Sequence, residues 1–144
     1  MIITITGKPA PQGSKRHIGN GRMIESSKAV GPWREAIRWA TAQARAGQPA
    51  LTGPVIVAVQ FAFARPAVHF GKGRNAGQLR ADAPRYPMTK TTTGDLDKLT
   101  RAVLDGITAG GAILDDKQVV ALDARKLYAD APGCRIDIRE MTDD

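Results

Sequence analysis

Cysteine, histidine and aromatic residues are scarce in this chain of 144 residues. It has one cysteine, two histidines and an aromatic content of 5%. A single cysteine excludes an internal disulfide and fits a reducing compartment. No run approaches the roughly 18 apolar residues of a membrane span, and the N-terminal segment lacks the apolar core of a signal peptide. We therefore expect a cytoplasmic protein in which Cys134 is a small core residue.

Acidic residues are scarce over most of the sequence as well. Residues 1–93 carry fourteen Lys and Arg against three acids, a net +11, whereas residues 94–144 carry seven against eleven, a net −4. The whole chain is at +7 with a pI near 10.0. Such a basic surface attracts a polyanion through counterion release, whatever the base sequence. Solubility alone is the other interpretation of the charge, but this pI favours nucleic-acid binding.

Length and hydrophobic pattern predict a single domain of the α+β class over residues 1–144, with a mixed β-sheet packed against two main helices. The clearest strand is 55–63, because an apolar residue stands at every second position. Trp33 and Trp39, on the first helix, are expected to pack in the core. Strands are expected at 2–6, 55–63, 119–128 and 134–140, and helices at 28–46 and 95–108, the second ending at Gly110-Gly111.

Two long basic segments are expected to lie outside regular structure. Residues 8–27 contain too much Gly and Pro for a helix and form a polar loop. Residues 64–93 are longer still, and loops of that length are uncommon in compact domains unless they are functional or mobile. We interpret 64–93 as a flexible basic flap, the alternative being a linker. His17 and His69 fall in these segments and are given no catalytic role.

Asp95 and Asp97 stand at the start of the second helix. Inside a regular helix their spacing would point them to nearly opposite sides. They converge only if Asp95 precedes the helix, at its N-cap or on an extended segment, with Asp97 in the first turn. The alternative is structural: Asp95 caps the helix and Asp97 complements its dipole.

A second acidic pair, Asp115-Asp116, follows the glycines that end this helix. The helix spans roughly 20 Å, so the pair approaches Asp95 only if the return segment runs antiparallel beside it. Carboxylates brought together repel one another unless a cation neutralises them. A site of oxygen ligands without His or Cys suits Mg²⁺ or Mn²⁺. These acids therefore predict a divalent-metal site inside a basic protein.

Two motifs in this region occur at 94–106, GDLDKLTRAVLDG, and at 114–119, LDDKQV. Together they resemble the RusA family of Holliday junction resolvases, whose pattern is an Asp-x-Asp-Asn-x-x-Lys helix followed after a short gap by Asp-Asp-x-Gln-Val. The opening segment 7–16, GKPAPQGSKR, is more loosely similar to the family's basic loop.

By this resemblance, Asp95, Asp97 and Asp116 take the three metal-binding positions, and Asp115 is a neighbour. Lys98 and Arg101 depart from the family, which has Asn and a catalytic Lys there. A guanidinium clamps a phosphate and stabilises developing charge, but its pKa prevents it from shuttling protons. Alternatively, Arg101 is only the ion-pair partner of Asp97 one turn earlier.

The resemblance implies a Mg²⁺-dependent endonuclease that resolves Holliday junctions and related branched DNA by paired nicking. A four-way junction has two-fold symmetry, so a C2 homodimer is expected. Two alternatives stay open: a non-catalytic basic nucleic-acid-binding module, and a metal-dependent nuclease for flaps or RNA. Only the spacing of the acids favours chemistry over binding. Phosphate contacts are expected from Lys15, Arg16, Arg74, Arg80 and Lys117.

Overall fold

The computed structural model of the chain describes residues 1–13, 15–17, 23–25, 28–89 and 92–143, with the backbone alone for 15–17 and 23–25. Its main sheet has the strand order β1-β6-β4-β5. Strand β6 runs antiparallel to both β1 and β4, whereas β4 and β5 are parallel. The predicted mixed sheet is therefore confirmed. Its strands are β1 (Ile2–Thr6), β4 (Val55–Phe63), β5 (Val119–Tyr128) and β6 (Gly133–Glu140).

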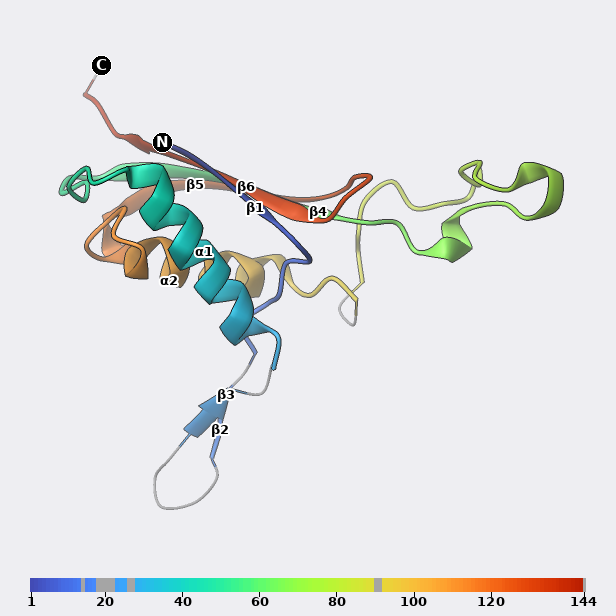
Figure 1. Cartoon of the computed structure of the whole chain (residues 1–144), viewed down its shortest axis with the longest axis horizontal. Coiled ribbons are helices and arrows are strands. Elements are labelled where there is room, and N and C mark those ends of the chain that lie inside the picture. The colour runs from blue at the N-terminus through green and yellow to red at the C-terminus, as the bar shows by residue number, and fades with distance from the viewer. Residues whose placement is uncertain (14, 18–22, 26–27, 90–91, 144) are drawn as a thin grey trace.

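Helices α1 (Val30–Arg45) and α2 (Leu96–Ala109) both lie on one side of this sheet (Figure 1). The alternation of β4 explains the arrangement, because Val55, Val57, Val59, Phe61 and Phe63 are buried toward the helices. Burial of these side chains with the apolar stripes of the helices is the main stabilising term. The result is a two-layer α+β domain, as expected, with one sheet face left without a helix.

The two helices approach each other closely at Gly106. A Cβ at that position would lie 2.6 Å from Cγ2 of Ile37 on α1, which is too close for any other residue without a shift. An ion pair between Arg34 and Asp105, 3.8 Å between Nη1 and Oδ2, joins the same two helices. This contact fixes α2, and with it the acids at its start, relative to the core.

The expectation of a loop over residues 8–27 is wrong in one part. Strands β2 (Lys15–His17) and β3 (Met23–Glu25) pair antiparallel there as a small second sheet. Three residues a side are too few to show a two-residue alternation in the sequence. The positions between and beside these strands, and the side chains of Lys15 and Arg16, fall outside the described part of the chain.

Residues 64–89 form an arm that projects beyond the end of the sheet (Figure 1). The arm contains two 3₁₀ turns, η1 (Ala67–His69) and η2 (Gly73–Asn75), and a bridge between Phe70 and Leu79. The Arg65 guanidinium donates to the carbonyl of Pro84 at 2.7 Å and so joins the outgoing and returning segments of the arm. The arm thus has local structure; its flexibility stays a prediction.

The tryptophans of α1 have different environments. Trp33 is buried at 5% exposure, as expected, but Trp39 is 61% exposed, so its expected place in the core is wrong. Six residues along a helix of 3.6 residues per turn put it about 120° away from Trp33. Cys134 is buried, and desolvation raises the pKa of its thiol to about 12, which confirms a core role. Within the described ranges, no helix has the length and apolar character needed to cross a membrane.

Candidate active site

Asp95 is the N-cap of α2 and adopts an extended conformation, with φ −80° and ψ 140°. Asp97 lies in the first turn of the helix. This is the entry geometry that convergence of the two side chains requires. The Asp95 carboxylate makes no capping hydrogen bond to the helix. The alternative that this side chain serves as a helix cap is therefore wrong. Its oxygens are not used by the backbone of the helix.

The turn into α2 is held by two segments that are distant in sequence. Gly94 has φ +83°, and a Cβ there would lie 2.6 Å from Cγ of Pro11, so the opening segment crosses directly over it. The backbone N–H of Gln12 donates to the backbone carbonyl of Lys98 at 3.1 Å and connects the same segment to the first turn of α2. Glycine is required here both for the backbone conformation and for the close approach.

Lys126 holds the other side of this turn and was not anticipated from the sequence. Its Nζ donates to the carbonyl of Gly94 at 2.8 Å and to Oγ1 of Thr93 at 3.3 Å. Lys126 stands in register with Phe61, whose side chain is in the core. A lysine at a core-facing position of a strand was the available signal, because such an ammonium needs acceptors within reach.

The two acids of the second pair have different environments, since Asp115 caps a turn and Asp116 is exposed. Asp115 is the N-cap of the short 3₁₀ turn η3 (Asp116–Gln118), and its Oδ1 accepts from the Lys117 amide at 2.8 Å. This backbone hydrogen bond holds the pKa of Asp115 below its ordinary value. Asp116 is exposed one residue later. Asp115 is therefore a capping residue, and Asp116 is the acid that the turn presents.

Gln118 fixes the turn that carries Asp116. Its Oε1 accepts from the amides of Leu114 and Asp115 at 2.7 and 3.0 Å. Its Nε2 donates to the carbonyls of Leu51 and Gly53 at 2.8 and 2.9 Å. One buried amide therefore bonds η3 to the segment before β4. The signal available in the sequence was a glutamine directly before an apolar strand, and no role was predicted for it.

Asp97, Arg101 and Asp116 line one open groove of about 750 Å³. The segment after α2 returns beside the helix, as the sequence reasoning required, because η3 contacts α2. Asp95 stands at the head of α2 but is not among the residues that line the groove. The other lining residues are Leu96, Lys98, Thr100 and Leu104 of α2 and Leu122 and Ala124 of β5.

The groove acids do not belong to ion pairs of the protein itself. Among the ion pairs between described residues, none joins Asp97 or Asp116 to a cation, and none joins Asp97 to Arg101. The alternative that Arg101 only neutralises Asp97 is therefore not realised. The groove thus contains two carboxylates and one exposed guanidinium that are not paired with each other.

The basic residues expected to contact DNA are differently placed. Arg74 is exposed in η2, out on the arm, and Lys117 is exposed beside Asp116. Arg80 is engaged with Asp82, at 3.1 Å between Nε and Oδ1 and 3.3 Å between Nη2 and Oδ2. Its charge is thus already partly compensated. Lys8, which was counted only as part of a basic loop, lies beside the turn into α2.

The donor set of the groove fits a hard divalent cation, although not as a complete cage. Within the described ranges, no three His, Cys, Asp or Glu side chains lie close enough together to hold an ion. Two carboxylates share the groove, however, and Mg²⁺ is usually bound by one or two carboxylates, with waters and substrate phosphates filling its other positions. The oxygen-only chemistry therefore matches Mg²⁺ or Mn²⁺ with a phosphate present.

Comparison with known proteins identifies the family of this chain. The family model "Endodeoxyribonuclease RusA" matches residues 5–139, which is nearly the whole chain. The chain is also similar to "Uncharacterized protein YqaN" of Bacillus subtilis (strain 168), at 26% identity over 141 residues, covering 97% of this chain and 96% of that protein. The match to the family spans the opening segment, both acidic motifs and the last strand, and so this chain belongs to the RusA family of endodeoxyribonucleases.

Proposed function

We propose that this protein is a Mg²⁺-dependent, structure-selective endonuclease that resolves four-way DNA junctions by paired nicking. The observation that carries the proposal is the shared groove, which Asp97, Arg101 and Asp116 all line without ion pairs among the described residues. Family membership supports endonucleolytic cleavage of DNA. The charge of residues 1–93 supports a polyanionic substrate.

Asp97 and Asp116 would hold the ion, with Asp95 as a third ligand reached from the head of α2. The bound ion supplies Lewis-acid polarisation of the scissile phosphate and a more acidic attacking water. Arg101 binds the same phosphate and stabilises the charge that develops on its oxygens. Its guanidinium keeps its charge at any working pH, so it serves electrostatics and leaves proton transfer to other groups.

A homodimer follows from the symmetry of the proposed substrate. A four-way junction must be nicked on two strands to be resolved, and a C2 pair of identical sites matches its two-fold axis. A cruciform extruded from a supercoiled plasmid distinguishes the two modes of cutting. Paired nicks within one binding event give linear product, whereas independent nicks first accumulate open circles.

The direct test is cleavage of a synthetic four-way junction with Mg²⁺ and with a chelator. We expect symmetric nicks on two opposing strands only with Mg²⁺, and little cleavage of a linear duplex with the same arm sequences. Parallel assays on a flap and on structured RNA test the alternative nuclease. Tight junction binding without cleavage under any divalent metal would support the binding-module alternative and overturn our proposal.

A further inference from the structure

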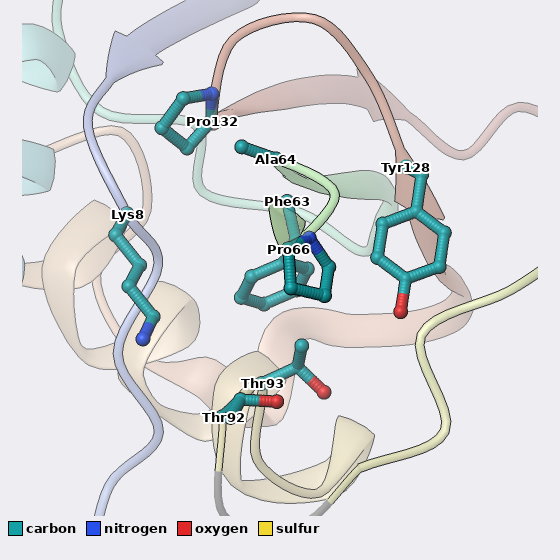
Figure 2. Close-up of a pocket in the computed structure, with 8 residues that line it drawn as sticks. All are labelled: Lys8, Phe63, Ala64, Pro66, Thr92, Thr93, Tyr128 and Pro132. Carbon is teal, nitrogen blue, oxygen red and sulfur yellow. The ribbon is translucent and has the colours of Figure 1, made fainter. Parts of the chain in front are cut away.

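A small pocket lies where β4 and β5 end, next to the turn into α2. Its volume is about 250 Å³. In Figure 2, Lys8 stands on one side and Tyr128 on the other, with the rings of Phe63 and Pro66 between them and Thr92 and Thr93 on the side of α2. Ala64 and Pro132 complete the lining. No role is assigned to this pocket by the groove chemistry or by the family match.

The pocket has the size and lining for one flat ring system. Sites for drug-sized ligands occupy about 300–1,000 Å³, so this one admits a smaller group. Phe63, Pro66 and Tyr128 offer apolar and aromatic surface for stacking, whereas Lys8 Nζ can meet ring carbonyls and nitrogens. The hydroxyls of Thr92 and Thr93 are already bonded to Thr89 and form a polar edge of the pocket. An apolar slot with a few polar groups at its edge is how proteins hold an unstacked base.

Tyr128 is held in place from its other side. The Arg65 guanidinium lies 4.4 Å from the centre of the Tyr128 ring. His69 meets the same ring edge-on, with the centroids 5.4 Å apart. Arg65 lines the neighbouring hollow with Tyr128 and not this pocket, so the ring forms a wall between the two. A tyrosine that is already ordered loses little conformational entropy when a ring stacks on it.

The charge around the pocket suits a nucleic acid strand. Among the described residues that line it there is no acid, and Lys8 is one of them. Lys126, two residues before Tyr128, donates to Thr93 in the pocket wall and to the carbonyl of Gly94. A phosphodiester that passes beside the pocket would therefore meet the Lys8 ammonium before it meets the carboxylates at the start of α2.

The backbone between the pocket and the groove corresponds to a few nucleotides. Thr93 is in the pocket wall, and Asp97, which lines the groove, follows it by four residues. Four residues span at most about 14 Å of backbone, and the phosphates of one strand repeat about every 3.4 Å along a duplex axis. A base a few steps from the scissile phosphate can thus reach the pocket.

We propose that this pocket receives a single nucleobase, swung out of its stack, from the DNA strand whose phosphate lies in the acid groove. The inference rests on the proposed function, because the groove defines which strand is bound. The pocket would select the cleavage position, because a base that stacks on Phe63 and Tyr128 and bonds Lys8 places a phosphate a few steps along the strand at Asp97 and Arg101. It would also hold the strand distorted at the junction branch point.

The test uses 2-aminopurine, which fluoresces more strongly when it leaves the base stack. It is placed in turn at each position within three nucleotides of the mapped nick in a four-way junction. The full-length protein carries Asp97→Asn to prevent cleavage and is compared with the double variant that also carries Ala64→Phe. The Ala64 side chain is exposed at the pocket, so a phenylalanine there fills the space without removing a core residue. Ala67→Phe is the matched control, an exposed alanine of the arm that does not line the pocket.

We expect one position to brighten on binding, the signal to vanish with Ala64→Phe, and the signal to persist with Ala67→Phe. In the cleaving protein, Ala64→Phe should lower the rate at the preferred site by roughly 5- to 150-fold, the range for loss of one stacked base. Brightening that survives Ala64→Phe, or no brightening at any position, would overturn the pocket. If the junction is cleaved normally in that case, the proposed nuclease stands. If it is bound but never cleaved, the nuclease fails, and 2-aminopurine placed in turn at each position around the branch point still decides the pocket.

Discussion

Acids on the open face of the sheet differ from the groove acids in their ion pairs. On the open face, Asp123 of β5 pairs with Arg125 at 3.0 Å, and Asp137 of β6 pairs with Arg139 at 2.8 Å. Each arginine follows its aspartate by two residues and so points to the same face of the strand. Both arginines hold the pKa of their aspartates below the ordinary value.

In the groove, Asp97 and Asp116 form no ion pair with Arg101 or with another cation in the part of the chain that the structure describes. The open-face acids are balanced by cations of the protein, and the groove acids are not. We therefore propose a structural role for the open-face acids and a metal-binding role for the groove acids.

The largest effect is expected from Asp97→Asn. Loss of a metal-binding carboxylate should reduce cleavage by about 10³-fold or more, since a bound ion supplies several kcal/mol to the transition state. Junction affinity should be kept or slightly improved, because one negative charge is removed. Asp123→Asn is the matched control on the open face and should cleave normally. Single-turnover rates and a binding titration decide; wild-type cleavage by Asp97→Asn would remove the metal-site hypothesis.

Arg101 should come next. Arg101→Ala should lose roughly 10²-fold in rate, the scale of one transition-state donor, whereas Arg101→Lys keeps a charge and should keep much of the activity. Arg125→Ala, on the open face, removes an exposed ion pair and should leave the rate unchanged. These rates are measured in single turnover at saturating Mg²⁺. Normal cleavage by Arg101→Ala would reduce Arg101 to a surface residue.

Gln118→Leu tests whether the position of Asp116 depends on the turn beneath it. Four hydrogen bonds of the amide are lost, and two half-buried carbonyls lose this donor. We expect the free energy of unfolding to fall by about 2–5 kcal/mol and the cleavage rate of the remaining folded protein to fall as well. Gln60→Leu, at an exposed position of β4, is the control. Urea unfolding and single-turnover cleavage would show the two losses; full activity in Gln118→Leu would separate Asp116 from the turn.

The smallest effect is expected in the salt dependence of binding. About six phosphate contacts predict a log–log slope near −5 for duplex arms. Arg74→Ala should make this slope shallower by about 0.9, the value of one lost contact. Arg80→Ala should change it less, because Arg80 is already paired with Asp82. Binding titrations over a salt series measure both; equal changes would mean that the Asp82 pair opens when DNA binds.

Sequence periodicity was sufficient for the main elements. The alternation of 55–63 gave β4 with the bounds that the structure has, and the second helix buries Leu99, Val103 and Ile107. Helix geometry alone required that Asp95 precede the helix if its side chain is to converge with that of Asp97, and the structure has Asp95 at the N-cap. The exposure of Trp39 was predictable as well, because its spacing of six residues from Trp33 puts it on another face of the helix. The β2–β3 hairpin could not be predicted, because three-residue strands leave no periodic signal.

Hydrogen bonds between segments distant in the chain could not be predicted from the sequence. Lys126 bonds to Gly94 across 32 residues, and Gln118 bonds to Leu51 across 67. Such bonds depend on strand order and register, which hydrophobic pattern does not fix for a mixed sheet. The different roles of Asp115 and Asp116 could not be predicted either. Adjacent acids look alike in a sequence, and only the position of the 3₁₀ turn determines which of them caps it.

The most direct test of the account is Mn²⁺ binding, followed by electron paramagnetic resonance, to the protein on a four-way junction. Asp97→Asn and Asp116→Asn should each lose the tightly bound ion, while Asp123→Asn and Asp137→Asn should retain it. That pattern would show that the groove acids, and not acidic residues in general, hold the cation. Equal Mn²⁺ binding by all four variants would contradict the assignment of the groove as a metal site.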